Sequence, residues 1–184
     1  MRTTAAWFED RIAAAVAPLL PGFGVEIAAE IDSTNAELMR RARAGRTAPV
    51  LLVAEHQTAG RGRLGRAWQS AQGQGGSDGP SSLMFSLALP LAPRDWSGLS
   101  LAVGVSVAES LDPTGAARVA LKWPNDLWVD DRKLVGILIE TAMPQGAPAP
   151  ARYVVIGIGI NIGPRDGGGM GTAPPRVRQG GPEA

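Results

Sequence analysis

Glycine and arginine alternate in one short segment of this chain, and such a segment can wrap an anion. Residues 60–66 read GRGRLGR, with Arg61 and Arg63 at the centre, and Trp68 follows. Glycine lets the backbone approach a ligand closely, while the planar guanidinium offers a fork of donors to a carboxylate or a phosphate. A solvated basic turn is the alternative, so this segment alone does not define a site.

Lysine is scarce, which draws attention to the two positions that carry it. The chain has sixteen arginines but only two lysines, Lys122 and Lys133. A lysine ammonium acts as a compact point charge on a phosphate, and arginine is a poor substitute for it there. The alternative is chance placement in an arginine-rich composition.

Composition limits the possible functions. The 184 residues suit one domain with a real core, and a net charge of +1 means that anion binding must come from local clusters. The absence of Cys and the single histidine, His56, exclude disulfides, thiolate nucleophiles and a His-based metal site, so no metal-ligating residues are expected. The N-terminal charges do not follow a secretory pattern, and the uncharged stretch 12–25 is too short to cross a bilayer. We expect a cytoplasmic protein without a membrane segment.

Apolar spacing and turn signals predict the elements that must position these residues. Helices are expected over 5–20, over 34–44 with Thr34 and Glu37 as a capping box and Gly45 as C-cap, and from Asp95 to about residue 110. Strands are expected at 25–31, 50–55, 83–89, 119–122, 127–129, 133–141 and 152–162, with a hairpin turn at 130–132 and alternating glycines at 157 and 159 that suggest close backbone approach.

This pattern predicts an α+β fold in which helices cover a mixed β-sheet. Residues 1–162 form the expected domain. We expect a flexible surface excursion at 71–82, a glycine- and proline-rich connection at 144–150, and a disordered Gly/Pro/Arg-rich tail at 163–184.

Five blocks of sequence occur in an order and at separations that together resemble the catalytic domain of biotin protein ligases. They are DSTN at 32–35, Gln57 with residues 60–66 and Trp68, KWPND at 122–126, KLVGIL at 133–138 and GIGIN at 157–161. The resemblance covers roughly residues 31–162. It implies a two-step reaction: the biotin carboxylate attacks the α-phosphate of ATP, with Mg²⁺, and the resulting biotinyl-adenylate passes its acyl group to a lysine of an acceptor. That acceptor would be the biotin carboxyl carrier protein of acetyl-CoA carboxylase.

The resemblance also implies roles for individual residues. Lys133, Arg63 and Asp126 are the expected catalytic residues, and Asp126 could orient either magnesium or the acceptor amine. The expected biotin- and nucleotide-binding residues are Ser33, Thr34, Asn35, Gln57, Gly60, Arg61, Gly62, Arg63, Trp68, Lys122, Asn125, Lys133, Gly136 and Asn161. Helix capping is the alternative for Ser33, Thr34 and Asn35, and ordinary turn chemistry is the alternative for Asn125 and Asn161.

Part of the sequence departs from this family. Such ligases usually continue past the GIGIN strand into further helices and a small C-terminal β-domain, and residues 163–184 match neither, so we expect an incomplete catalytic domain. Nothing before the first helix predicts a DNA-binding helix-turn-helix.

Three other functions stay open: a lipoate or octanoate ligase, a biotin-binding remnant with little activity, and an Arg-Gly nucleic-acid binder. The last is disfavoured because the basic run is short and no aromatic-rich platform for stacking on bases accompanies it. The resemblance leaves a homodimer open.

Overall fold

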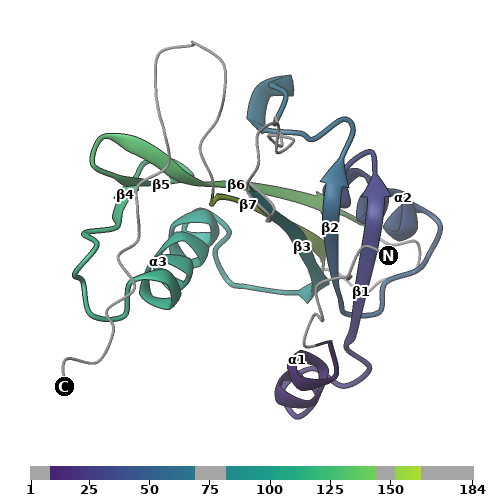
Figure 1. Cartoon of the computed structure of the whole chain (residues 1–184). Coiled ribbons are helices and arrows are strands. Elements are labelled where there is room, and N and C mark those ends of the chain that lie inside the picture. The colour runs from purple at the N-terminus through teal and green to yellow at the C-terminus, as the bar shows by residue number, and fades with distance from the viewer. Residues whose placement is uncertain (1–8, 69–81, 144–151, 163–184) are drawn as a thin grey trace.

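The computed structural model describes residues 9–68, 82–143 and 152–162. Within these ranges a seven-stranded sheet carries helices on both faces (Figure 1). The elements in chain order are α1 (Glu9–Val16), β1 (Gly24–Ile31), α2 (Thr34–Arg43), β2 (Val50–Gln57), the 3₁₀ turn η1 (Arg63–Gly65), β3 (Ser82–Leu91), α3 (Leu99–Leu111), β4 (Ala120–Lys122), β5 (Asp126–Val129), β6 (Arg132–Ala142) and β7 (Arg152–Asn161).

The sheet has the order β1-β2-β3-β7-β6-β5-β4. β1 and β2 are parallel, and every other neighbouring pair is antiparallel. The fold is therefore the mixed sheet covered by helices that the sequence predicts.

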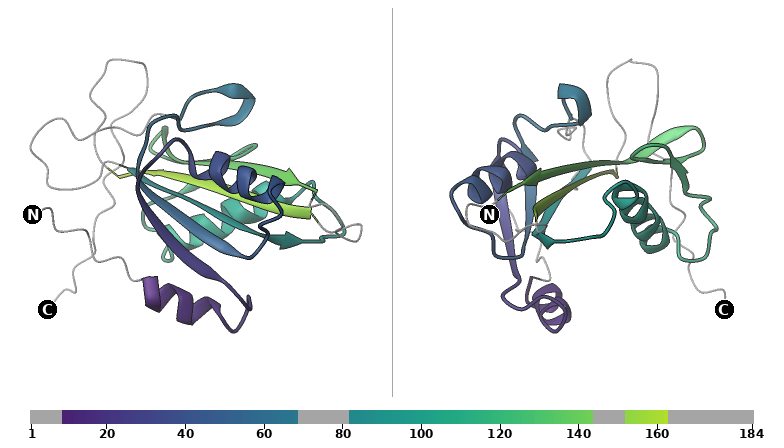
Figure 2. Two further views of the ribbon diagram at one scale, coloured as in Figure 1. Left: turned by 90° about the vertical axis from the view of Figure 1, so that its right-hand side faces the viewer. Right: turned by 180° about the vertical axis from the view of Figure 1, so that it is seen from behind.

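Alternating side chains on β7 divide the core into two layers, because successive residues of a strand point to opposite faces. Val154 and Ile156 belong to a cluster that packs against α3, whereas Tyr153 and Val155 belong to a cluster with Leu38 of α2. The two helices thus cover opposite faces of the sheet (Figure 2). Gly157 and Gly159 follow the parity of Val155 and lie on the α2 face, where the missing side chains leave room.

Three helix boundaries differ from the sequence prediction. Among the described residues α1 ends at Val16 rather than near residue 20, since Pro18 lacks an amide donor and disfavours helix before it. Ser33, not Thr34, is the N-cap of α2, with extended backbone and an Oγ that accepts from the amide of Ala36 at 3.4 Å. Asp95 caps a turn instead of α3: it accepts from the amide and hydroxyl of Ser97, and Gly98 is the N-cap.

Other local predictions are confirmed. Gly45, at φ 79°, ends α2 by donating to the carbonyl of Ala42, and the next amide donates to the carbonyl of Arg41. The tight turn between β5 and β6 has Asp130 and Asp131 at positive φ, as a two-residue hairpin requires. Residues 5–8, the segments expected at 144–150 and 163–184, and residues 71–81 of the excursion expected at 71–82 lie outside the described residues. Ser82, the last residue of that excursion, instead begins β3. No helix in the described part of the chain is long and apolar enough to cross a membrane.

Candidate active site

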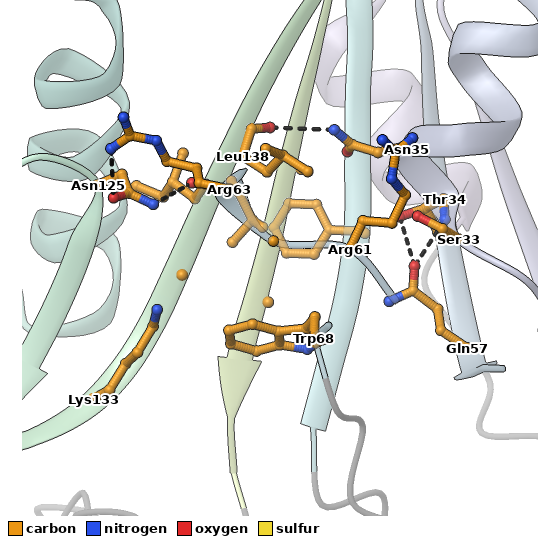
Figure 3. Close-up of a pocket in the computed structure, with 17 residues that line it drawn as sticks. Ser33, Thr34, Asn35, Gln57, Arg61, Arg63, Trp68, Asn125, Lys133 and Leu138 are labelled. Atoms are coloured by element: carbon orange, nitrogen blue, oxygen red, sulfur yellow. Dashed lines mark hydrogen bonds between the residues drawn. The ribbon is translucent and has the colours of Figure 1, made fainter. Parts of the chain in front are cut away.

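A pocket opens on the α2 face of the sheet, beneath the glycine-arginine segment, which we call the anion loop (residues 58–68). Figure 3 shows a polar end at Thr34 and Gln57, Trp68 in the middle, and a second polar end at Lys133, Arg63 and Asn125. The lining residues come from the start of α2, the end of β2, the anion loop, the turn between β4 and β5, and strands β3, β6 and β7. They are Ser33, Thr34, Asn35, Gln57, Arg61, Gly62, Arg63, Trp68, Phe85, Asn125, Lys133, Gly136, Ile137, Leu138, Gly157, Ile158 and Gly159.

The first polar end is built where β1 and β2 finish side by side. The amide of Thr34 donates to Oε1 of Gln57 at 2.7 Å, and the Thr34 hydroxyl lies 3.2 Å from the same oxygen. Both residues are buried. A small polar group in this end of the pocket would therefore meet fixed hydrogen-bonding atoms.

An ion pair on the outside braces this end. Arg40 of α2 holds both carboxylate oxygens of Asp32, at 2.7 and 2.8 Å, and one of those oxygens also accepts from the amide of Ser33. The hydrogen bonds from Arg40, followed in importance by that amide, lower the pKa of Asp32 to about 2 against the opposing effect of partial burial. The carbonyl of Asp32 accepts from the amide of Ala59, which ties the start of the anion loop to the end of β1.

A chain of buried polar side chains runs beneath the pocket. Ser86 of β3, fully buried, has its Oγ 2.7 Å from Oγ1 of Thr34 and 2.6 Å from Oδ1 of Asn35. The amide nitrogen of Asn35 donates to Glu140 at 3.0 Å and to the carbonyl of Leu138 at 3.3 Å. Glu140 also faces Arg61 of the anion loop at 3.8 Å. Neither Ser86 nor Glu140 was expected from sequence, although each is a polar residue that follows a run of apolar residues within its strand.

The anion loop is closed by its own backbone. Trp68 donates its amide to the carbonyl of Gly60 at 2.8 Å, and Gly62 donates to Arg66 at 2.7 Å. Leu64 and Gly65 turn the chain with φ of 57° and 72°. This closure directs Arg61 and Arg63 to different ends of the pocket, since Arg61 faces Glu140 and Arg63 donates to Oδ1 of Asn125 at 3.1 Å.

Trp68 lies on a floor of glycines, and only glycine fits there. A Cβ on Gly136 would come within 2.6 Å of Cζ3 of Trp68, and a Cβ on Gly159 would overlap the same indole. At Gly157 a Cβ would overlap the side-chain amide of Asn35. The close approach that the alternating glycines predict is confirmed, and it lets the apolar indole of Trp68 lie flat on the sheet in the middle of the pocket.

The second polar end is cationic. Nζ of Lys133 lies 2.8 Å from Oδ1 of Asp126 and 5.5 Å from the centre of the Trp68 ring. Asn125 is fixed by its neighbour strand, because its amide nitrogen donates to the carbonyl of Ile137 at 2.7 Å. Two cationic groups, those of Lys133 and Arg63, thus converge on one end of the pocket, where they could stabilise a carboxylate or phosphate.

The structure brings most of the expected site residues together, with four outside the lining. Gly60 supports the loop, since a Cβ there would overlap the carbonyl of Trp68. Asp126 does not line the pocket but pairs with Nζ of Lys133, which does, and Asn161 donates to the carbonyl of Lys133 at 2.9 Å. Lys122 lies over the ring of Trp128, 3.6 Å from its centre, on the exposed strand β4.

The described residues do not form a resident metal site. They contain no cluster of three or more His, Cys, Asp or Glu side chains that could hold an ion. Asp126, the carboxylate expected to serve magnesium, is paired with Lys133. Mg²⁺ commonly binds through one or two carboxylates together with substrate phosphates, so the donor set fits only an ion that arrives with a nucleotide.

Two solved biotin ligases share this architecture. A biotin acetyl coenzyme A carboxylase synthetase from Helicobacter pylori, with bound biotinylated ATP, is 30% identical with a TM-score of 0.59 over 74% of this chain and 60% of that one. A biotin protein ligase from Aquifex aeolicus, in complex with biotin and ATP, is 31% identical with a TM-score of 0.54 over 74% of this chain and 51% of that one.

Sequence comparison agrees with the structural likeness. The model of the biotin/lipoate A/B protein ligase family matches residues 28–161. The bifunctional ligase/repressor BirA of Escherichia coli is 41% identical over 79% of this chain, and the biotin--[acetyl-CoA-carboxylase] ligase of Mycobacterium tuberculosis is 38% identical over 75% of it. The chain belongs to the biotin/lipoate A/B protein ligase family. It spans 43% and 49% of the length of these two relatives, about half in each case.

Proposed function

We propose that this chain activates biotin with ATP and transfers the biotinyl group to a lysine of a biotin carboxyl carrier protein. The observation that carries the proposal is the order of surfaces along one pocket. A buried polar end, an apolar middle around Trp68 and a cationic end follow one another. Biotin has the same order: a cyclic urea, an apolar body with an aliphatic chain, and a carboxylate.

In the first step the carboxylate oxygen attacks the α-phosphorus of ATP and pyrophosphate leaves. Thr34, Gln57 and Ser33 would hold the urea, so that the carboxylate is directed to the cationic end. Lys133 and Arg63 would then stabilise the negative charge that develops on the phosphate oxygens. This assignment agrees with the 2.8 Å contact to Asp126, which aims the ammonium group, and with the bond of Arg63 to Asn125.

In the second step the acceptor lysine amine attacks the acyl carbon and AMP leaves. Trp68 and the anion loop would exclude water from the mixed anhydride until the amine arrives. Asp126 is the carboxylate next to Lys133, which keeps both its expected roles possible: it could orient the acceptor amine or contact nucleotide-borne magnesium. Mg²⁺ would supply charge neutralisation for the leaving pyrophosphate. Lys122 and Asn161 remain proposed nucleotide-side residues.

The lipoate or octanoate alternative is not favoured. Relatives that are 36% to 44% identical over most of the chain are named as biotin ligases or as bifunctional ligase/repressors. A lipoyl head group also lacks the N–H and C=O groups of a cyclic urea, so it would make no strong hydrogen bonds with the polar end at Thr34 and Gln57. We also propose a cytoplasmic location, where ATP is available for the reaction.

The test is a transfer assay with the whole chain. The chain is incubated with biotin, ATP, Mg²⁺ and a carrier domain, and the carrier is weighed by mass spectrometry. We expect the mass to increase by one biotinyl group, with no increase when ATP is omitted, when lipoate replaces biotin, or when the acceptor lysine is replaced by arginine. Biotin-dependent ATP–pyrophosphate exchange tests the first step separately. Absence of both activities, with biotin still bound, would leave the binding remnant as the function.

A further inference from the structure

The buried polar chain beneath the pocket fixes where its hydroxyl protons lie. Three oxygen pairs matter: Asn35 Oδ1 with Ser86 Oγ at 2.6 Å, Ser86 Oγ with Thr34 Oγ1 at 2.7 Å, and Thr34 Oγ1 with Gln57 Oε1 at 3.2 Å. Ser86 and Thr34 have one hydroxyl proton each, whereas the two amide oxygens can only accept. Two protons must therefore serve three contacts.

Glu140 determines the orientation of the Asn35 amide. The amide nitrogen faces the Glu140 carboxylate at 3.0 Å and the carbonyl of Leu138 at 3.3 Å, and both of those groups only accept. The Asn35 oxygen must then face Ser86. Because Asn35 and Ser86 are both buried, bulk water cannot reach them to replace these hydrogen bonds.

The shortest contacts take the two protons. Without a proton between them, the oxygens of Asn35 and Ser86 would repel each other at 2.6 Å, so the Ser86 hydroxyl donates to Asn35. Ser86 then presents a lone pair to Thr34, and Thr34 must donate to Ser86 across 2.7 Å. The oxygen of Gln57 is already served by the Thr34 amide at 2.7 Å and needs no second donor.

We infer that Ser86, oriented by Glu140 through Asn35, makes the Thr34 hydroxyl an acceptor toward the pocket, and so selects ligands whose head group donates an N–H there. This inference rests on the proposed function and deepens it. Thr34 lines the pocket, and with its proton committed to Ser86 it offers only lone pairs to a ligand. A cyclic urea has two ring N–H donors, whereas a ring oxygen at the same place would face a lone pair. Ser86 is thus a positioning residue for head-group recognition, although it does not line the pocket.

The experiment compares biotin with its two cyclic carbamate analogues, in each of which one ureido N–H is replaced by a ring oxygen of nearly the same size. Dissociation constants for the whole chain are measured by calorimetry without ATP. We expect the chain to bind at least one carbamate about tenfold or more weakly than biotin, since a site built around a donor rejects the analogue that lacks it. Both carbamates binding as tightly as biotin would overturn the inference, whether or not any variant folds.

Ser86→Ala then separates proton direction from packing. In S86A the Thr34 hydroxyl loses its acceptor and can rotate to donate to the ring oxygen, so the preference for biotin over that carbamate should fall to within about threefold, while biotin itself binds only a few times more weakly. Ser82→Ala is the matched control, because Ser82 lies on the same face of β3, is also buried, and has a hydroxyl that makes no hydrogen bond within the described residues. S82A should keep the full preference.

An equal loss of affinity for biotin and carbamate in S86A would indicate a merely structural role and would overturn the inference. A preference that S86A leaves unchanged would do the same. If the unmodified chain fails to bind biotin at all, the proposed function falls and this inference falls with it, whereas biotin binding without discrimination refutes the inference alone.

Discussion

Replacing Lys133 by methionine is the most direct test of the cationic end of the pocket. The ammonium group lies 2.8 Å from Asp126 and the side chain keeps about a third of its surface exposed. Methionine has a similar length, so K133M removes the charge while keeping most of the contact with the Trp68 ring. The perturbation is therefore electrostatic rather than steric.

Two effects of very different size are expected. A fixed group that stabilises charge in the transition state contributes about 10²- to 10³-fold to kcat, or about 2.7 to 4 kcal/mol. The ion pair with Asp126 is partly exposed, and such pairs contribute about 1 kcal/mol or less to folding after solvent screening. K133M should thus lose at least a hundredfold in adenylate formation and remain folded.

The assay is biotin-dependent ATP–pyrophosphate exchange, read together with urea unfolding of the same samples. Arg43→Met is the control, since Arg43 is an exposed cation in the last turn of α2 and does not line the pocket. R43M should exchange pyrophosphate at the rate of the unmodified chain. Exchange by K133M within threefold of that rate would refute the assignment of Lys133.

Three further predictions concern the glycines beneath Trp68, the buried core, and the ion pair of Asp32 with Arg40. Gly159→Ala puts a methyl group into the indole of Trp68, and overpacking of about 1 to 3 kcal/mol should weaken biotin binding roughly tenfold, measured by calorimetry. Tyr153→Phe removes a buried hydroxyl that donates to a backbone carbonyl at 2.9 Å, and burial raises the pKa of this hydroxyl. The free energy of unfolding in urea should fall by about 1 to 2 kcal/mol, while biotin affinity stays unchanged. Asp32→Asn should remove an acid-sensitive part of stability: because Arg40 lowers the pKa of Asp32 from 3.8 to about 2, its contribution is present above about pH 4 and disappears as the pH falls toward 2.

Each of these has its own contrary result. Gly24→Ala controls G159A, because nothing lies within 4 Å of a Cβ placed at Gly24, and equal biotin affinity in the two variants would contradict the fit of Trp68. For Y153F, unchanged unfolding would mean that the hydroxyl bond adds nothing net. For Asp32, the free energy of unfolding is compared between the unmodified chain and D32N from pH 2 to pH 5. A constant difference between the two over this range would show that the ion pair of Asp32 with Arg40 contributes no acid-dependent stability.

Much of the fold could be predicted because it depends on local signals. Alternation and β-branched residues indicated each strand, and Gly45 indicated the end of α2 through a backbone conformation that few residues adopt. The choice between Ser33 and Thr34 as N-cap could not be made locally, since both side chains can cap. Only the packing of Thr34 against Gln57, 23 residues away, determines that Ser33 takes the role.

The site was predictable where a residue type has few uses, and obscure where partners are distant. Glycine at 157 and 159 within an apolar strand indicated close neighbours, although not that these would be Asn35 at Gly157 and Trp68 at Gly159. Ser86 and Glu140 gave no such indication, because their importance comes from Asn35, which is 51 and 105 residues away from them. For Lys122, the sequence could not reveal that a short edge strand directs its ammonium to Trp128.

The position of β7 has a consequence for how the protein is made. This strand is the last described element in the chain, yet it lies between β3 and β6 in the middle of the sheet and pairs with both. A ribosome therefore releases six strands before the one that joins their two halves, and until residue 161 has emerged β3 and β6 each have an edge of unsatisfied amides and carbonyls. A stalled product that stops short of β7 should therefore aggregate rather than fold.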